Sequence, residues 1–184
     1  MPEFDLPKRK ALRGYFVAAL LVAVAGLLAW GVRVQTKGEL LKVGSVAPDF
    51  TGSVGGGGPV RLSELVKTTR VVLVFYPADN TSICTSQLCA LRDSISDLEA
   101  LDCTVLGINP ADEQKHAQFS SKYHFPFHLV SDAGGEIAKQ YGCSGIFGLN
   151  KRTVYIINRD RTVLFAQRGV PSVSDMLSAL KSAK

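Results

Sequence analysis

The pattern of hydrophobic and polar positions divides the chain into an apolar N-terminal segment and a longer globular part. Nineteen uncharged residues separate Arg13 from Arg33, and as a helix they would span about 28 Å, close to the thickness of a hydrocarbon core. We therefore predict a transmembrane helix over residues 14–32, preceded by a basic flank at 1–13 and followed by a linker at 33–41.

Aromatic and basic residues flank this predicted helix. Tyr15 and Trp30 lie near its two ends, where amphipathic rings favour the membrane interface. The alternative is a cleaved signal peptide, but the Ala23-Val24-Ala25 triplet that resembles a cleavage site lies inside the apolar run. The positive-inside bias favours a cytoplasmic N-terminus, which would place the remaining domain in an extracytoplasmic, periplasm-like space.

From residue 42 onward, strand-like and helix-like patterns alternate. A continuous β-branched and aromatic run at 70–77 is typical of a strand that is buried on both faces. A loop follows, and then apolar residues at spacings of three and four predict a helix over 84–101. Further strands are predicted at 46–50, 103–108, 127–130, 153–157 and 163–167, with helices at 112–123, 135–141 and from 172. This alternation predicts an α/β layered domain with a largely parallel sheet at 42–184.

The charge distribution argues against a nucleic-acid partner. The 184 residues carry a formal charge of +5. Residues 1–38 contain six Lys/Arg and two Asp/Glu, which is +4, so the remaining 146 residues carry +1. A nearly neutral domain without a cluster of basic residues offers no electrostatic footprint for nucleic acid.

Four cysteines could form disulfides, bind a metal, pack in the core or react. The chain has no C-x-x-C, and no histidine lies near Cys84 or Cys89, so neither a zinc site nor a thioredoxin-type redox motif is favoured. Cys84 lies where a central strand has ended and a helix is starting. Unpaired backbone N–H groups and the helix dipole would favour its thiolate there. The alternative for Cys84 is a buried, inert thiol.

The spacing of Cys84 and Cys89 has a mechanical consequence. In a continuous helix their Cα atoms would be about 8.7 Å apart, beyond the roughly 6.8 Å that a disulfide tolerates. A disulfide between them would therefore require the first turns of the helix to unwind.

The residues around Cys84 resemble the peroxiredoxins. The segment from Pro77 to Cys84 has the form P-x-x-x-T-x-x-C, and the longer run over 75–93 is similar to the bacterioferritin comigratory protein/PrxQ branch, whose resolving cysteine lies five residues on in the same helix. The resemblance extends over about residues 42–184, and includes matches at 47–50, 107–108, 116, 119, 122–123, 125–127, 129, 131–132, 141–142 and 152. It departs from that branch at Ser82-Ile83, where Pro-Gly is usual.

The resemblance implies a thioredoxin-like fold with a central mixed β-sheet flanked by helices. It implies that Cys84 is the peroxidatic cysteine and Cys89 the resolving cysteine. Pro77 would shield the thiolate, Thr81 would bind the peroxide oxygens, and Arg152 would stabilise the thiolate and the developing oxyanion.

The reaction implied is the reduction of hydrogen peroxide or alkyl hydroperoxides, with a thioredoxin-like dithiol as reductant and no metal or organic cofactor. An in-helix cysteine pair would make the monomer catalytically sufficient. Two other functions stay open: a membrane-anchored redox sensor whose disulfide a partner reads, and a dithiol oxidoreductase that acts on protein disulfides.

The remaining cysteines and the histidines are predicted to lie outside the chemistry. Cys103 opens an apolar strand and is expected in the core. Cys143 is expected to be a small buried residue, with an alternative resolving or regulatory thiol as the other interpretation. The three histidines are predicted to be surface or packing residues, and they are His116, His124 and His128.

Overall fold

A seven-stranded mixed sheet organises the residues that the computed structural model describes, which are 38–55 and 57–183. The strands lie in the order β2-β1-β5-β4-β3-β6-β7. Their bounds are β1 Thr51–Val54, β2 Gly58–Arg61, β3 Arg70–Phe75, β4 Cys103–Asn109, β5 His128–Ser131, β6 Thr153–Ile157 and β7 Val163–Arg168. The β3–β4 and β4–β5 pairings are parallel, and the other four are antiparallel.

The mixed sheet expected from the resemblance is confirmed, whereas the largely parallel sheet expected from the strand–helix alternation is wrong. The reason lies at the two ends of the sheet. The hairpin of β1 and β2 and the hairpin of β6 and β7 each add antiparallel strands to a short parallel centre. Hairpin strands follow each other without a helix between them, so they do not need the parallel arrangement of a βαβ unit.

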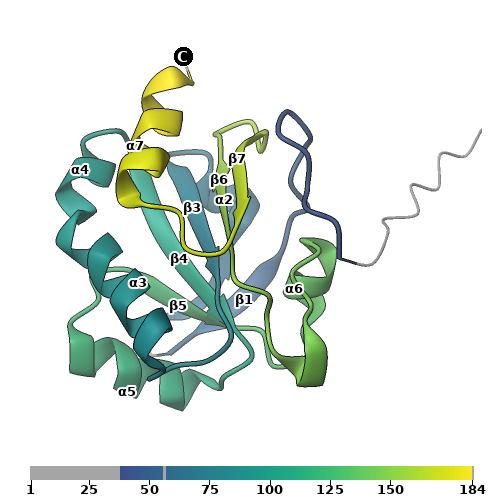
Figure 1. The fold of residues 1–184 in the computed structure, drawn as a ribbon, viewed down its shortest axis with the longest axis vertical. Coiled ribbons are helices and arrows are strands. Elements are labelled where there is room, and N and C mark those ends of the chain that lie inside the picture. The colour runs from purple at the N-terminus through teal and green to yellow at the C-terminus, as the bar shows by residue number, and fades with distance from the viewer. Residues whose placement is uncertain (1–37, 56, 184) are drawn as a thin grey trace, which may run out of the picture. The chain divides into compact units, whose positions relative to one another are not determined.

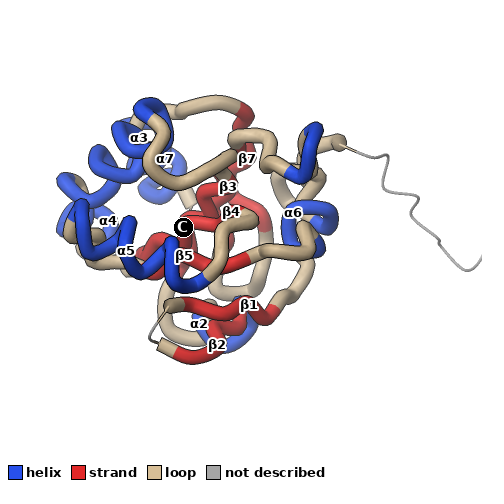
Figure 2. The backbone as a smooth tube through the Cα atoms, turned by 90° about the horizontal axis from the view of Figure 1, so that it is seen from below, coloured by secondary structure: helices blue, strands red, loops and turns tan. Residues whose placement is uncertain are grey.

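The helices form layers on the two faces of the sheet (Figures 1 and 2). Their bounds are α2 Leu62–Leu65, α3 Ser82–Asp93, α4 Ile95–Glu99, α5 Glu113–Tyr123, α6 Glu136–Gln140 and α7 Val173–Ser182, with a 3₁₀ turn, η1, at Ile146–Gly148. Helices α3, α4, α5 and α7 pack into the apolar cluster on one face, and α2 and α6 pack into the cluster on the other.

Strand β3 divides these two clusters and leads into the site. Alternate side chains of a strand point to opposite faces, so Val72 and Val74 join the α3 cluster while Leu73 and Phe75 join the α6 cluster. All four are fully buried, as the continuous apolar run predicts. The chain leaves the carboxyl end of β3 in a loop and then enters α3.

The helix predicted over 84–101 is two helices in the structure. Helix α3 ends at Asp93, because Ser94 has φ −112° and ψ 17° and leaves the helical conformation. Helix α4 then begins at Ile95. The apolar spacing continues across the break because Leu91 and Leu98 pack into the same cluster on either side of it.

Several short elements differ from expectation. Residues 46–50 form no strand apart from a single bridge at Val46, and the first strand begins at Thr51. Helix α2 and the turn η1 were not expected, because elements of three or four residues carry no readable periodicity.

The predicted membrane helix at 14–32 lies outside the described residues. Within 38–55 and 57–183, no helix has the length and apolarity needed to cross a bilayer. The end of the predicted linker contacts the domain: the backbone N–H of Leu41 donates to the Tyr155 hydroxyl at 3.2 Å, and Arg168 donates to the Gly38 carbonyl at 2.8 Å.

Candidate active site

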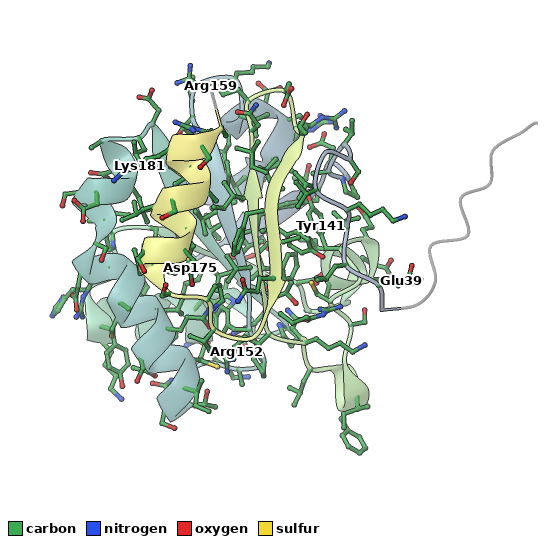
Figure 3. The ribbon with its side chains drawn as sticks, turned by 45° about the horizontal axis from the view of Figure 1, so that its top comes forward. Glu39, Tyr141, Arg152, Arg159, Asp175 and Lys181 are labelled. Carbon is green, nitrogen blue, oxygen red and sulfur yellow. The ribbon has the colours of Figure 1, made fainter. Side chains whose placement is uncertain are left out.

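The structure brings Cys84 and Arg152 together across 68 residues of sequence. Cys84 lies in the first turn of α3 and is fully buried. Arg152 directly precedes β6, and its Nη2 donates to the Cys84 Sγ at 3.1 Å. Figure 3 places Arg152 at the opposite end of the domain from Arg159. The fold therefore places Arg152 in contact with Cys84, while the reactivity of Cys84 stays a prediction.

The surroundings of Cys84 place hydrogen-bond donors and a positive charge near its sulfur. Backbone N–H groups in the first turn of a helix have no partner within the helix, and the helix dipole adds positive potential there. The guanidinium of Arg152 stays charged and offers fixed donors. The first turn of α3 and Arg152 thus both present positive potential to the Cys84 sulfur.

The other two buried cysteines show the effect of burial on a thiol. Burial raises the pKa of the Cys103 thiol to about 12, because removal from water penalises the charged form. The pKa of the Cys143 thiol is also raised by burial. Both thiols therefore stay protonated near neutral pH, as expected for core residues.

Gln87 is a third member of the site that the sequence alone did not single out. Its Oε1 accepts a hydrogen bond from Arg152 Nη1 at 2.8 Å, so one guanidinium spans the amide and the Cys84 sulfur. Gln87 is 4% exposed, and its Nε2 has no hydrogen-bond partner among the described residues. The signal for it is the spacing of three from Cys84, which puts both side chains on one face of a helix.

Pro77 and Thr81 lie in the loop that connects β3 to α3. Pro77 is half-buried, and Thr81 is the exposed residue that precedes the first helical turn. The Thr81 hydroxyl donates to the Ala78 carbonyl at 3.4 Å. The structure thus places both residues at the entrance to α3, with the Thr81 hydroxyl directed to the loop backbone rather than to the sulfur of Cys84.

Cys89 lies in α3 with Cys84, and neither cysteine forms a disulfide within the described residues. Cys89 is half-buried and packs against the same apolar cluster as Cys84. Cys143 belongs to the cluster on the opposite face of the sheet, and Cys103 opens β4 beside Arg70, the first residue of β3. The helical spacing of Cys84 and Cys89 keeps their Cα atoms about 8.7 Å apart while α3 is wound.

A buried polar network lies behind the loop. The Asp79 carboxylate accepts from the Tyr76 hydroxyl at 2.8 Å and from Asn109 Nδ2 at 2.7 Å. His116 Nδ1 lies 2.9 Å from the second oxygen of Asp79. Burial, followed by the neighbouring Asp79 charge, raises the pKa of Tyr76 well above its usual range. His116 is thus a buried packing residue with one polar contact, whereas His124 and His128 are exposed.

An apolar groove of about 560 Å³ runs between α3 and the start of α7. It is lined by Ser82, Ile83, Ser86, Gln87, Ala90, Leu91, Val170, Pro171, Ser172, Val173 and Met176. Ile83 and Val170 are more than half exposed along it. Gln87 connects the groove to the arginine–cysteine pair. No cluster of His, Cys, Asp and Glu side chains in the described ranges has the arrangement of a metal site.

Comparisons with known proteins agree with this geometry. The AhpC/TSA family profile matches residues 43–166. "Peroxiredoxin Q, chloroplastic" from Triticum aestivum is 41% identical over 124 residues, which cover 66% of this chain and 57% of that protein. The protein of the same name from Arabidopsis thaliana is 42% identical over 122 residues, 65% of this chain and 56% of that protein. The match thus spans just over half the length of these curated relatives.

Solved structures match over nearly their whole length. The crystal structure of peroxidoxin BcpB from Mycobacterium tuberculosis has a TM-score of 0.74 and 33% identity, and the match covers 78% of this chain and 99% of that one. A PrxQ mutant from Xylella fastidiosa has a TM-score of 0.72 at 24% identity, covering 79% of this chain and 98% of that one, and this likeness shows the fold alone. The thioredoxin-like α/β fold expected from the resemblance is confirmed.

The predicted localisation is wrong. The sequence was expected to belong to a single-pass membrane protein with an extracytoplasmic domain. The curated relatives that match are named as chloroplastic peroxiredoxins Q, and none of the helices within the described ranges could cross a bilayer. The prediction rested on the apolar run, on the aromatic residues near its ends and on the distribution of Lys and Arg, and none of these identifies the compartment.

Proposed function

Because the chain belongs to the AhpC/TSA family, we propose that it is a thiol peroxidase of the peroxiredoxin Q type, with Cys84 as the peroxidatic cysteine and Cys89 as the resolving cysteine. The observation that supports this most strongly is the 3.1 Å hydrogen bond from Arg152 to the sulfur of a fully buried cysteine in the first turn of a helix. The nucleophilic form of cysteine is the thiolate, and the guanidinium of Arg152 places a positive charge beside that sulfur.

In the first step, the Cys84 thiolate attacks one oxygen of a hydroperoxide. An S–O bond forms and the O–O bond breaks, so the sulfur is oxidised by two electrons to a sulfenic acid while the leaving oxygen takes up a proton as water or an alcohol. Negative charge moves from the sulfur toward the leaving oxygen. Arg152 presents donors along that line, with Gln87 holding the guanidinium in place. Pro77 limits water around the sulfur, and Thr81 binds the peroxide.

In the second step, the Cys89 thiol attacks the sulfenic sulfur, a disulfide forms and water leaves. The first turns of α3 must unwind for this step, because the wound helix keeps the two Cα atoms too far apart. A thioredoxin-like dithiol then reduces the disulfide: its own two thiols become a disulfide, and Cys84 and Cys89 return to thiols.

The proposed substrates are hydrogen peroxide and alkyl hydroperoxides. The apolar groove beside α3 supports alkyl hydroperoxides as substrates, because the transfer of a hydrocarbon chain from water to an apolar surface lowers the free energy. Gln87, which lines the groove and contacts Arg152, would lie between the chain of such a substrate and its reacting end.

The test is peroxide consumption by the purified full chain with excess dithiothreitol. We expect sustained consumption by the wild type and by Cys103→Ala, which changes a buried thiol at the start of β4. Cys84→Ser should consume no peroxide above the rate of the reductant alone. Activity of Cys84→Ser at the wild-type rate would overturn the proposal. Oxidation of Cys84 without sustained turnover would favour a redox sensor instead.

A further inference from the structure

The buried network around Asp79 ties the loop before α3 to distant parts of the fold. Asp79 lies midway between Pro77 and Thr81, the two residues that the loop contributes to the site. Its hydrogen-bond partners Asn109 and His116 are 30 and 37 residues away, at the end of β4 and in α5. The side chain of Asp79 is 7% exposed and that of His116 is 1% exposed. The loop is therefore anchored to the core through one carboxylate.

The hydrogen bonds on that carboxylate follow from its chemistry. An ionised carboxylate only accepts hydrogen bonds. One oxygen of Asp79 already accepts from Tyr76 and Asn109, and the other faces His116 Nδ1, so Nδ1 acts as the donor. The Nε2 of His116 has no partner within the described residues. Within the described residues, the hydrogen bond to Asp79 is thus the polar contact that the His116 ring makes.

Asn80, which follows Asp79 in the loop, has an unfavourable backbone conformation. Asn80 has φ 57°, a left-handed conformation that costs free energy in residues other than glycine and is best tolerated by asparagine and aspartate. Its one long-range side-chain contact is an exposed hydrogen bond of 3.5 Å from Lys122. The side-chain hydrogen bonds that tie the loop to distant buried residues are therefore those of Asp79.

We infer that Asp79 and His116 are positioning residues that hold the loop at 77–81 and thereby favour the wound state of α3. Asp79 is five residues before Cys84, so a movement of the first turns of α3 pulls on the chain that Asp79 anchors. In the wound state Cys84 lies beside Arg152 and can react with peroxide. In the unwound state it can reach Cys89. The network sets the balance between the two steps of the proposed peroxidase cycle, on which this inference rests.

A shift from the wound to the unwound state of α3 should speed disulfide formation and slow the reaction with peroxide. When the unwound state is rare, the rate of disulfide formation rises in proportion to its population. The peroxide step depends on the wound population, which falls much less. Loss of one buried hydrogen bond to a charged group corresponds to a shift on the order of tenfold in such an equilibrium. A general loss of structure would slow both steps together.

Two substitutions of His116 give a matched pair. The side-chain amide nitrogen of asparagine occupies nearly the position of the histidine Nδ1, whereas that of glutamine reaches the position of Nε2. His116→Asn therefore keeps a donor to Asp79, and His116→Gln moves it away. Lys122→Ala removes the exposed contact to the same loop and serves as the control for a surface change. Asp79→Ala replaces His116→Gln if that variant does not fold.

The experiment is a single turnover of the reduced full chain with hydrogen peroxide, stopped by acid at millisecond to second intervals. A sulfenic-acid trap and thiol alkylation followed by mass spectrometry give the two rates separately. We expect His116→Gln to form the disulfide about tenfold faster than the wild type, with an equal or slower peroxide step and less over-oxidation to sulfinic acid. His116→Asn and Lys122→Ala should resemble the wild type.

Equal disulfide rates in His116→Gln and the wild type would overturn the inference, and so would a parallel fall of both steps in His116→Gln and His116→Asn. A wild-type protein that forms no sulfenic acid at Cys84 would remove the proposed function and this inference with it. A wild type with both steps intact but no difference among the variants would remove the inference alone.

Discussion

Replacement of Arg152 by methionine removes both donors that the guanidinium provides, the one to the Cys84 sulfur at 3.1 Å and the one to Gln87 at 2.8 Å. Methionine keeps most of the side-chain volume and cannot donate. At an effective dielectric constant of about 20, a unit charge at that distance from a thiolate is worth up to about 5 kcal/mol. Competition from water reduces this to about 1.5–3 kcal/mol for a charged hydrogen bond in the resting enzyme.

In the proposed reaction the transition state would depend on Arg152 more than the resting thiolate does, because charge would then move onto oxygen atoms that the same donors face. Removal of one preorganised donor from such a site costs about 3–4 kcal/mol, or 10²–10³ in rate. We therefore expect kcat/KM for hydrogen peroxide to fall about 100- to 1,000-fold in Arg152→Met. Arg152→Lys keeps the charge but cannot span both acceptors, so we expect a fall on the order of tenfold.

The assay is stopped-flow competition for hydrogen peroxide with a peroxidase of known rate, on protein whose circular dichroism matches the wild type. Arg159→Met is the matched control, because Arg159 makes an exposed ion pair with Asp102 at 3.2 Å and lies at the far end of the domain (Figure 3). It should leave kcat/KM unchanged. A folded Arg152→Met protein within about threefold of the wild type would contradict this role of Arg152, since loss of a typical neutral hydrogen bond, about 1 kcal/mol, already corresponds to about fivefold.

Further predictions concern the resolving cysteine, the pH dependence of stability and the packing of Glu39. Cys89→Ser should react with the first equivalent of peroxide at the wild-type rate and then accumulate sulfenic acid, which a dimedone trap detects; rapid disulfide formation in this variant would contradict the role of Cys89. The pKa of Cys103 is raised from 9.0 to about 12, so the folded thiol keeps its proton while the unfolded thiol loses it as the pH rises through 9. The wild type should therefore lose about 1.4 kcal/mol more unfolding free energy than Cys103→Ala between about pH 8 and pH 10, measured by urea denaturation under reducing conditions; equal losses would contradict this. Gly142→Ala should destabilise the fold by about 2 kcal/mol or more, because Gly142 has φ +67° and its Cβ would collide with the Glu39 carbonyl, whereas Gly44→Ala, at φ +86° in open space, should cost about 1 kcal/mol from backbone strain alone. Equal thermal midpoints for the two glycine variants would show that the Glu39 segment does not pack as described.

The central strand and the main helices could be predicted from sequence because their signals are local. The run at 70–75 is buried on both faces, and a continuous apolar pattern is what such a strand requires. The helix break at Ser94 left no such signal, because the apolar stripe continues on both sides of it. The antiparallel pairing of β3 with β6 joins segments about 80 residues apart, and no local pattern specifies it.

The features of the candidate site also divide into those with a local sequence signal and those that depend on tertiary packing. Cys84 and Cys89 are close in sequence, so helix geometry alone gives their separation and the need for unwinding. The role of Arg152 came from the resemblance, and the fold supplies the contact with Cys84. The hydrogen bond between Asp79 and His116 joins a loop to a helix 37 residues away, and it depends on how α5 packs against β5 and β1. Contacts of this kind arise from tertiary packing and could not be read from residue spacing.

The most direct test of the account is the identity of the disulfide formed after one equivalent of hydrogen peroxide. Peptide mapping by mass spectrometry of the full chain, alkylated under acid conditions, gives that identity in one measurement. We predict a bridge between Cys84 and Cys89, with Cys103 and Cys143 alkylated only after denaturation because both are buried. A disulfide from Cys84 to Cys143, or four cysteines that all remain reduced, would contradict the proposed role of Cys89.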